Sequence, residues 1–173
     1  MSPRLPPSLS WCVLPSAALL LALGCGAPAE PGLGLELRMS QAVASEIGSF
    51  QVAVMAEDRT RSCADLQRTC LNQQVRSDEL LQISGADKRP VRALRFTAAL
   101  TGTAPASQQL NVDIPVGRKY VVVIEALSRA SPPRFLGSSC NYLESVSATR
   151  NEPLIAAPIT LATSNTCDPT FAP

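Results

Sequence analysis

The chain has 173 residues, of which 15 are Lys or Arg, 14 are Asp or Glu and none is histidine. So small a net charge gives no long-range field to attract nucleic acid, and we expect no nucleic-acid partner. The absence of histidine excludes Ser-His-Asp and Cys-His catalysis and the common metal sites. Because a P-loop and an EF-hand loop are also missing, no cofactor or metal site is predicted.

The chain begins with a segment typical of a signal peptide. Arg4 is the only charged side chain before Glu30, and residues 11–23 are apolar apart from Pro15 and Ser16. A helix of this length rises only about 20 Å, which is short of the roughly 30 Å hydrocarbon core of a membrane. We therefore predict a signal peptide over residues 1–24 rather than a spanning helix.

The end of this segment carries a cleavage motif. The residues Leu21-Ala22-Leu23-Gly24-Cys25 resemble the lipobox of bacterial lipoproteins, in which the chain is cut before the cysteine and the cysteine is acylated. The resemblance implies that Cys25 is the lipidation site and that the mature protein is held at a membrane surface. Gly26 after the cysteine implies sorting to the outer membrane.

Residues 25–34 follow as a flexible tether. They include two prolines and offer almost nothing to bury, and they span at most about 30 Å. An alternative is an ordinary secretory signal that is cut after Ala27-Pro28-Ala29, which would leave a soluble, secreted protein without Cys25.

Residues 35–173 are predicted to form one all-β domain. Its apolar residues alternate with period two over several short stretches, and turn residues separate the stretches about every dozen positions. This pattern favours an antiparallel β-sandwich with no long helix. The alternating stretches are residues 50–54, 94–100, 110–116 and 155–161.

Two of the predicted strands have distinct positions in the sheet. Residues 120–127 are apolar on both faces except at Glu125, which predicts a central strand that is covered on both sides. The last strand is expected to point Ile155, Ala157, Ile159 and Leu161 inward. Its Pro158 cannot donate to a ladder, so this strand should lie at an edge or be bulged there.

The alternation lapses over residues 57–90, which are predicted to be a disulfide-stapled excursion from the sandwich. Ser62 and Asp65 form the pattern of a capping box for a short helix that runs through Leu66 toward Val75. We expect the excursion either to carry a family-specific contact or to cover an open sheet edge.

Four cysteines outside the leader, Cys63, Cys70, Cys140 and Cys167, predict two disulfides in an exported protein, with three possible connectivities. On one regular helix Cys63 and Cys70 would be about 10.5 Å apart, too far for a bridge. Either the segment between them turns back or each pairs elsewhere. Locality favours Cys63 with Cys70 and Cys140 with Cys167.

One turn resembles a known fold family. The stretch IPVGRKYVVVIEA at residues 114–126 is similar to the turn and penultimate strand of fibronectin type III and immunoglobulin-like domains, with Ile114, Gly117 and Tyr120 at matching spacing. The resemblance implies that the Tyr120 hydroxyl bonds back across the corner. A similar turn occurs in transthyretin-like carboxypeptidase regulatory domains. The only tryptophan, Trp11, lies in the signal peptide, so the buried tryptophan of antibody-type domains is absent.

The sequence contains two clusters of charged residues. Glu57, Asp58 and Asp65 are interleaved with Arg59 and Arg61, and such a mixture is expected to be a solvated surface rather than an acid–base pair.

The second cluster is basic, and its members are Lys88, Arg89, Arg92 and Arg95. It is expected to be a solvated turn and strand face rather than an anionic-ligand site, because no aromatic or glycine-rich cradle accompanies it in the sequence.

The sequence thus predicts a membrane-anchored lipoprotein of the cell envelope, without enzymatic activity and with a structural or recognition role. Besides the membrane, another envelope protein or a polysaccharide is the expected kind of partner. The alternative is a secreted, soluble, carboxylate-dependent hydrolase or an inhibitor of one.

Overall fold

The computed structural model describes residues 32–58, 60–101, 105–162 and 167–171. The predicted signal peptide, Cys25 and most of the tether lie outside the described residues. Among the residues that are described, no helix is long and apolar enough to cross a membrane.

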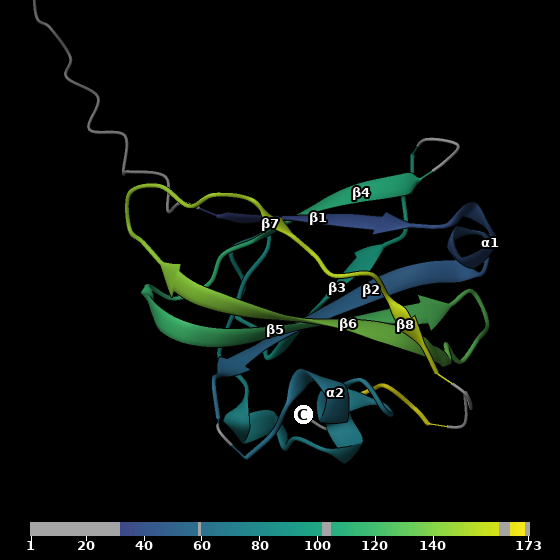
Figure 1. Cartoon of the computed structure of the whole chain (residues 1–173), viewed down its shortest axis with the longest axis horizontal. Helices are drawn as coiled ribbons and strands as arrows, with labels where there is room; N and C mark the ends of the chain where they lie inside the picture. The colour runs from purple at the N-terminus through teal and green to yellow at the C-terminus, as the bar shows by residue number, and fades with distance from the viewer. Residues whose placement is uncertain (1–31, 59, 102–104, 163–166, 172–173) are drawn as a thin grey trace, which may run out of the picture.

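The described chain folds into two packed β-sheets (Figure 1), so the all-β prediction is confirmed. The smaller sheet has the order β4-β1-β7 and the larger the order β3-β2-β5-β6-β8. The strands are β1 (Leu33–Met39), β2 (Ile47–Ala56), β3 (Ala93–Thr97), β4 (Ala106–Val112), β5 (Gly117–Ser128), β6 (Phe135–Val146), β7 (Leu154–Ile155) and β8 (Thr160–Leu161).

All strand pairs are antiparallel except β1 with β7. The first two strands lie in opposite sheets, whereas the constant-type immunoglobulin order keeps them in one sheet. The turn at residues 114–126 therefore predicts the sandwich class without determining its strand order. The Tyr120 hydroxyl does bond back across the corner, where it donates to the Pro115 carbonyl at 3.2 Å.

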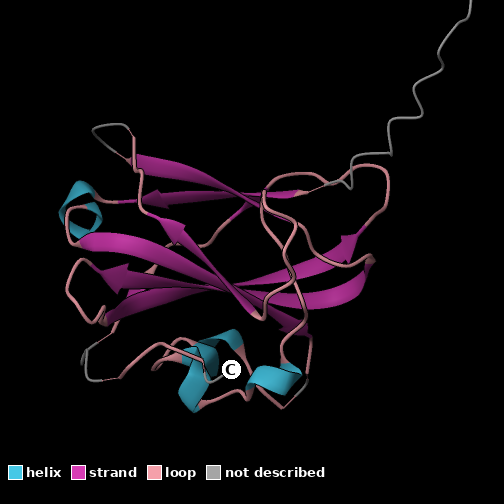
Figure 2. Ribbon diagram, turned by 180° about the vertical axis from the view of Figure 1, so that it is seen from behind, coloured by secondary structure: helices cyan, strands magenta, loops and turns pink. Residues whose placement is uncertain are grey.

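The described helices are short (Figure 2), and all but one belong to the excursion beneath the larger sheet. Helix α1 (Gln41–Ala44) connects β1 to β2. The excursion contains α2 (Cys63–Leu66) and two 3-10 turns, η1 (Leu71–Gln73) and η2 (Ser77–Glu79). Ser62 and Asp65 form the predicted capping box, but the helix ends at Leu66 instead of running toward Val75.

Strand β5 lies in the middle of the larger sheet, as predicted, and both of its faces are covered. Val122, Ile124 and Ala126 face the smaller sheet and belong to the main hydrophobic core. Val121 and Val123 face the other way and pack in a second core under the excursion. The excursion is therefore a third layer, which explains why this strand is apolar on both sides.

The prediction for the last strand is wrong in part. The segment divides into β7 in the smaller sheet and β8 in the larger, with Pro158 between them. Ile155, Ala157 and Leu161, which were expected to point inward, are exposed, Ile155 to 59% and Leu161 to 53%. Since the chain crosses from one sheet to the other here, period-two alternation fails. Leu154 and Ala156 pack on the core instead, and Ile159 packs there as expected.

Candidate functional site

Two disulfides fix the excursion and the C-terminal segment to the sandwich. Cys63 is bonded to Cys140 with a Cα–Cα distance of 5.3 Å, and Cys70 is bonded to Cys167 with a distance of 6.0 Å. The four cysteines form two bridges as expected, but the predicted pairing is wrong. The excursion lies flat on the larger sheet, so its cysteines reach β6 and the C-terminal segment rather than each other.

Apolar contacts hold the excursion against the sheet as well. Its buried residues pack on side chains of β2 and β5 in the second core. The excursion covers a face of the larger sheet, whereas one expectation from the sequence was that it covers an edge. The buried excursion residues in this core are Leu66, Leu71, Val75 and Leu80.

A row of polar side chains crosses the sheet beneath this cover. The register places Arg95, Gln51, Glu125, Ser138 and Thr160 opposite one another on five successive strands. Residues that are directly opposite share one face of a sheet. This polar row crosses an otherwise apolar layer. It is where the excursion and the C-terminal segment are attached to the sheet.

Glu125 is the centre of the polar row. Its side chain is buried, and its two carboxylate oxygens accept hydrogen bonds from Gln51 Nε2 and from the Leu71 backbone N–H, each at 2.8 Å. Burial raises the pKa of Glu125 above its usual value, although both hydrogen bonds act in the opposite direction. The break in the apolar pattern at this position was visible in the sequence, but its partners were not.

Gln51 extends the row to the C-terminal segment and to β3. Its amide nitrogen also donates to the Pro169 carbonyl at 2.9 Å, and its amide oxygen accepts from Arg95 at 3.0 Å. Asn72 in the excursion donates to the carbonyls of Asp168 and Thr170. Together with the Cys70–Cys167 bridge, these contacts hold the C-terminal segment beside β3.

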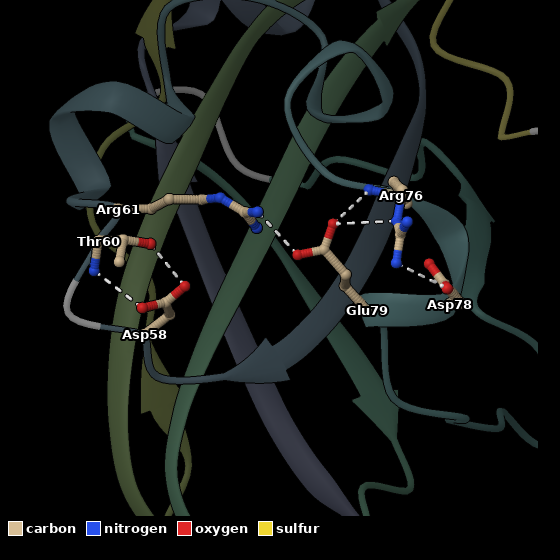
Figure 3. A network of polar contacts seen from close by, with 6 residues as sticks. All are labelled: Asp58, Thr60, Arg61, Arg76, Asp78 and Glu79. Carbon is tan, nitrogen blue, oxygen red and sulfur yellow. Dashed lines mark hydrogen bonds and ion pairs between the residues drawn. The ribbon is translucent and has the colours of Figure 1, made fainter.

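The acidic cluster noted in the sequence does not form one site, because each of its acids has different partners. Asp58 accepts hydrogen bonds from the backbone N–H and the hydroxyl of Thr60 at 2.8 Å and 2.6 Å (Figure 3). Asp65 caps α2 through Ser62. The Glu57 backbone N–H donates to the Lys119 carbonyl. Arg59 lies outside the described residues.

Glu79 was not a candidate from the sequence. It lines the same cavity as Asp58, whereas Asp65 does not. Glu79 pairs with Arg61 at 2.7 Å and accepts from the Arg76 backbone, and both acids line a cavity of about 180 Å³. Hydrogen bonds from Thr60 lower the pKa of Asp58, and those from Arg76 and Arg61 lower the pKa of Glu79. Both shifts favour the charged form of the two carboxyl groups.

The basic cluster separates into two parts. Lys88 pairs with Asp113 at 2.7 Å, and Arg89 is exposed. Arg92 and Arg95 instead line an open groove of about 570 Å³, which we call the arginine groove. Its other lining residues include Gln51, Ala93, Thr170 and Phe171.

Phe171 supplies an aromatic wall to the groove that Arg92 and Arg95 line. It lies far along the chain and reaches the groove because the C-terminal segment is bonded to the excursion and to Gln51. No local motif in the sequence connects Phe171 to β3, so its place in the groove could not be predicted.

Comparison of the chain with protein-family models, curated proteins and solved structures gives no match. Among the described residues, no three potential metal-ligating side chains gather at one point. The arginine groove, bounded by β3, the excursion and the C-terminal segment, is the best candidate site.

Proposed function

We propose that the protein is a membrane-anchored lipoprotein of the bacterial cell envelope, acylated at Cys25, with a non-enzymatic recognition role. The observation that carries this proposal is the pair of long-range disulfides, Cys63–Cys140 and Cys70–Cys167. Disulfides of this kind form and persist in exported proteins. They support the export that the signal-like segment and the lipobox-like motif at Cys25 predict.

The recognition role is supported by what the disulfides hold in place. They fix the excursion and the C-terminal segment against one face of the sandwich. The arginine groove lies where these two segments meet β3. The tether ahead of β1 would keep the folded domain near the membrane, where another envelope protein or a polysaccharide would meet it. Gly26 favours the outer membrane as the location.

The test is the intact mass of the mature protein purified from membranes, measured before and after reduction. The expected species begins at acylated Cys25 and gains the mass of two hydrogens for each of two bridges on reduction. The matched control is Cys25→Ser, which leaves all four disulfide cysteines in place and should release the protein from the membrane fraction. A native chain that begins at Glu30 and carries no acyl group would contradict the anchor and favour the secreted alternative.

A further inference from the structure

Strand β3 has an open outer edge. It forms one edge of the larger sheet and pairs only with β2. The Ala98 N–H donates to the Gly48 carbonyl. Because hydrogen-bonded positions alternate along an antiparallel pair, the backbone N–H and C=O groups of Ala93, Arg95 and Thr97 point away from β2. The outward groups of Ala93 and Arg95 have no hydrogen-bond partner among the described residues.

Both ends of this open stretch are occupied. Val91, just before β3, exchanges two backbone hydrogen bonds with Ile83. Beyond β3, the Gln108 side chain donates to the Thr97 carbonyl at 3.0 Å and accepts from the Ala99 N–H at 2.7 Å, so its amide takes the place of a paired strand. The open edge is therefore a short gap, of a length that a few extended residues would fill.

The arginine groove lies beside this gap and is positively charged. Arg92 and Arg95 are exposed, and neither has a carboxylate within ion-pair distance among the described residues. Arg92 donates to the Leu80 carbonyl and Arg95 to Gln51, so both guanidinium groups are held in position. The one acid in the lining, Asp78, is paired with Arg76 at 3.0 Å.

We propose that the arginine groove binds an extended acidic peptide, which adds to the edge of β3 at Ala93 and Arg95 and places its carboxylates on Arg92 and Arg95. Strand addition uses backbone hydrogen bonds for affinity and alternate side chains for specificity. Phe171 lines the same groove and provides an apolar wall for the methylene groups of the acidic side chains. This inference rests on the recognition role proposed above and names its ligand class.

The probe is the peptide acetyl-Thr-Glu-Val-Glu-Thr-amide, in which both acids point to one side of an extended chain. Mature full-length protein in detergent is titrated with the probe, and binding is followed by calorimetry and by the amide signals of Ala93 and Arg95 in NMR spectra. Two analogues carry backbone N-methyl groups, one analogue at the valine and the other at both glutamates. Because successive N–H groups of an extended peptide point to opposite edges, each analogue blocks hydrogen bonding at one edge. A lysine analogue and an acidic polysaccharide test charge and polymer class.

The expected result is that the acidic peptide binds and moves the Ala93 and Arg95 signals, and that one of the two N-methyl analogues fails to bind. Arg92→Gln and Arg95→Gln should each weaken binding roughly tenfold or more, as for a lost charge-assisted hydrogen bond. Arg89→Gln is the matched control, since Arg89 is exposed in the same sequence cluster but does not line the groove, and it should leave binding unchanged.

The proposal is overturned if the folded protein does not bind the acidic peptide, if the lysine peptide binds equally well, or if both N-methyl analogues bind as the parent does. Binding of the polysaccharide in place of the peptide would also overturn it. The N-methyl comparison uses unmutated protein, so it decides the question even if a substitution at Arg95 impairs folding. Acylation at Cys25 is read from the mass of the same preparation, which keeps a failure of the anchor distinct from a failure of peptide binding.

Discussion

The disulfide Cys63–Cys140 crosses the disulfide Cys70–Cys167 in the sequence, and this sets the expected cost of removing either one. With one bridge intact, the second closes a path of about 34 residues, because Cys63 and Cys70 are seven positions apart and Cys140 and Cys167 are 27 positions apart. In the chain-entropy relation a loop of that length contributes about 4 kcal/mol. Cys63→Ala/Cys140→Ala and Cys70→Ala/Cys167→Ala should therefore each lower the free energy of unfolding by about 4 kcal/mol and agree within about 1 kcal/mol.

Urea unfolding of the two double variants and the native protein measures this cost, and tryptic mapping without reduction checks the pairing directly. Cleavage after the arginines separates all four cysteines into peptides 62–68, 69–76, 135–150 and 151–173. The linked pairs should be 62–68 with 135–150 and 69–76 with 151–173. The reasoning is refuted if 62–68 is linked to 69–76, or if either double variant is as stable as the native protein.

Four further substitutions test individual contacts of the fold. Burial raises the pKa of Glu125, so the stability that this group contributes is present below about pH 4 and is lost as pH rises through its folded-state pKa. Between these two pH values, urea unfolding should show the native protein losing up to about 1.4 kcal/mol per pH unit relative to Glu125→Gln. Parallel pH profiles of the two proteins would contradict this. Tyr120→Phe should cost about 1 kcal/mol in thermal or urea unfolding through the lost hydrogen bond to Pro115. Gly117→Ala should cost more, because its Cβ would overlap the Tyr120 hydroxyl, and less in the Tyr120→Phe background; equal costs in the two backgrounds would rule out that clash. Ser62→Ala should cost about 1 kcal/mol through the lost cap of α2, and an unchanged unfolding midpoint would mean that the cap contributes nothing.

Sequence patterns were sufficient to predict those features whose determinants all lie within one short stretch of the chain. Alternation of apolar residues placed β2 and β3, and the apolar run at residues 120–127 identified β5 as the central strand. The stretch predicted at residues 110–116 overlaps β4 only at residues 110–112. The capping box at Ser62 and the corner contact of Tyr120 also depend on residues within a few positions. Each of these features is a short-range relation that a single chain segment displays.

Local pattern failed where contacts join distant segments. Cys63 and Cys70 are near in sequence, yet each pairs with a cysteine more than 70 positions away. The strand expected to end at Leu161 is divided between two sheets because the chain crosses the open side of the sandwich.

The arginine groove shows the same division between sequence and tertiary structure. Arg92 and Arg95 were noted as a basic cluster, but Phe171, Gln51 and the open edge of β3 reach them only through the fold. The sequence by itself determined the all-β class, the central strand and the number of disulfides, because periodicity and residue counts report burial and cross-linking potential. Tertiary structure alone decided the pairing, the strand order and the site, since those depend on which surfaces meet once the excursion lies on the larger sheet.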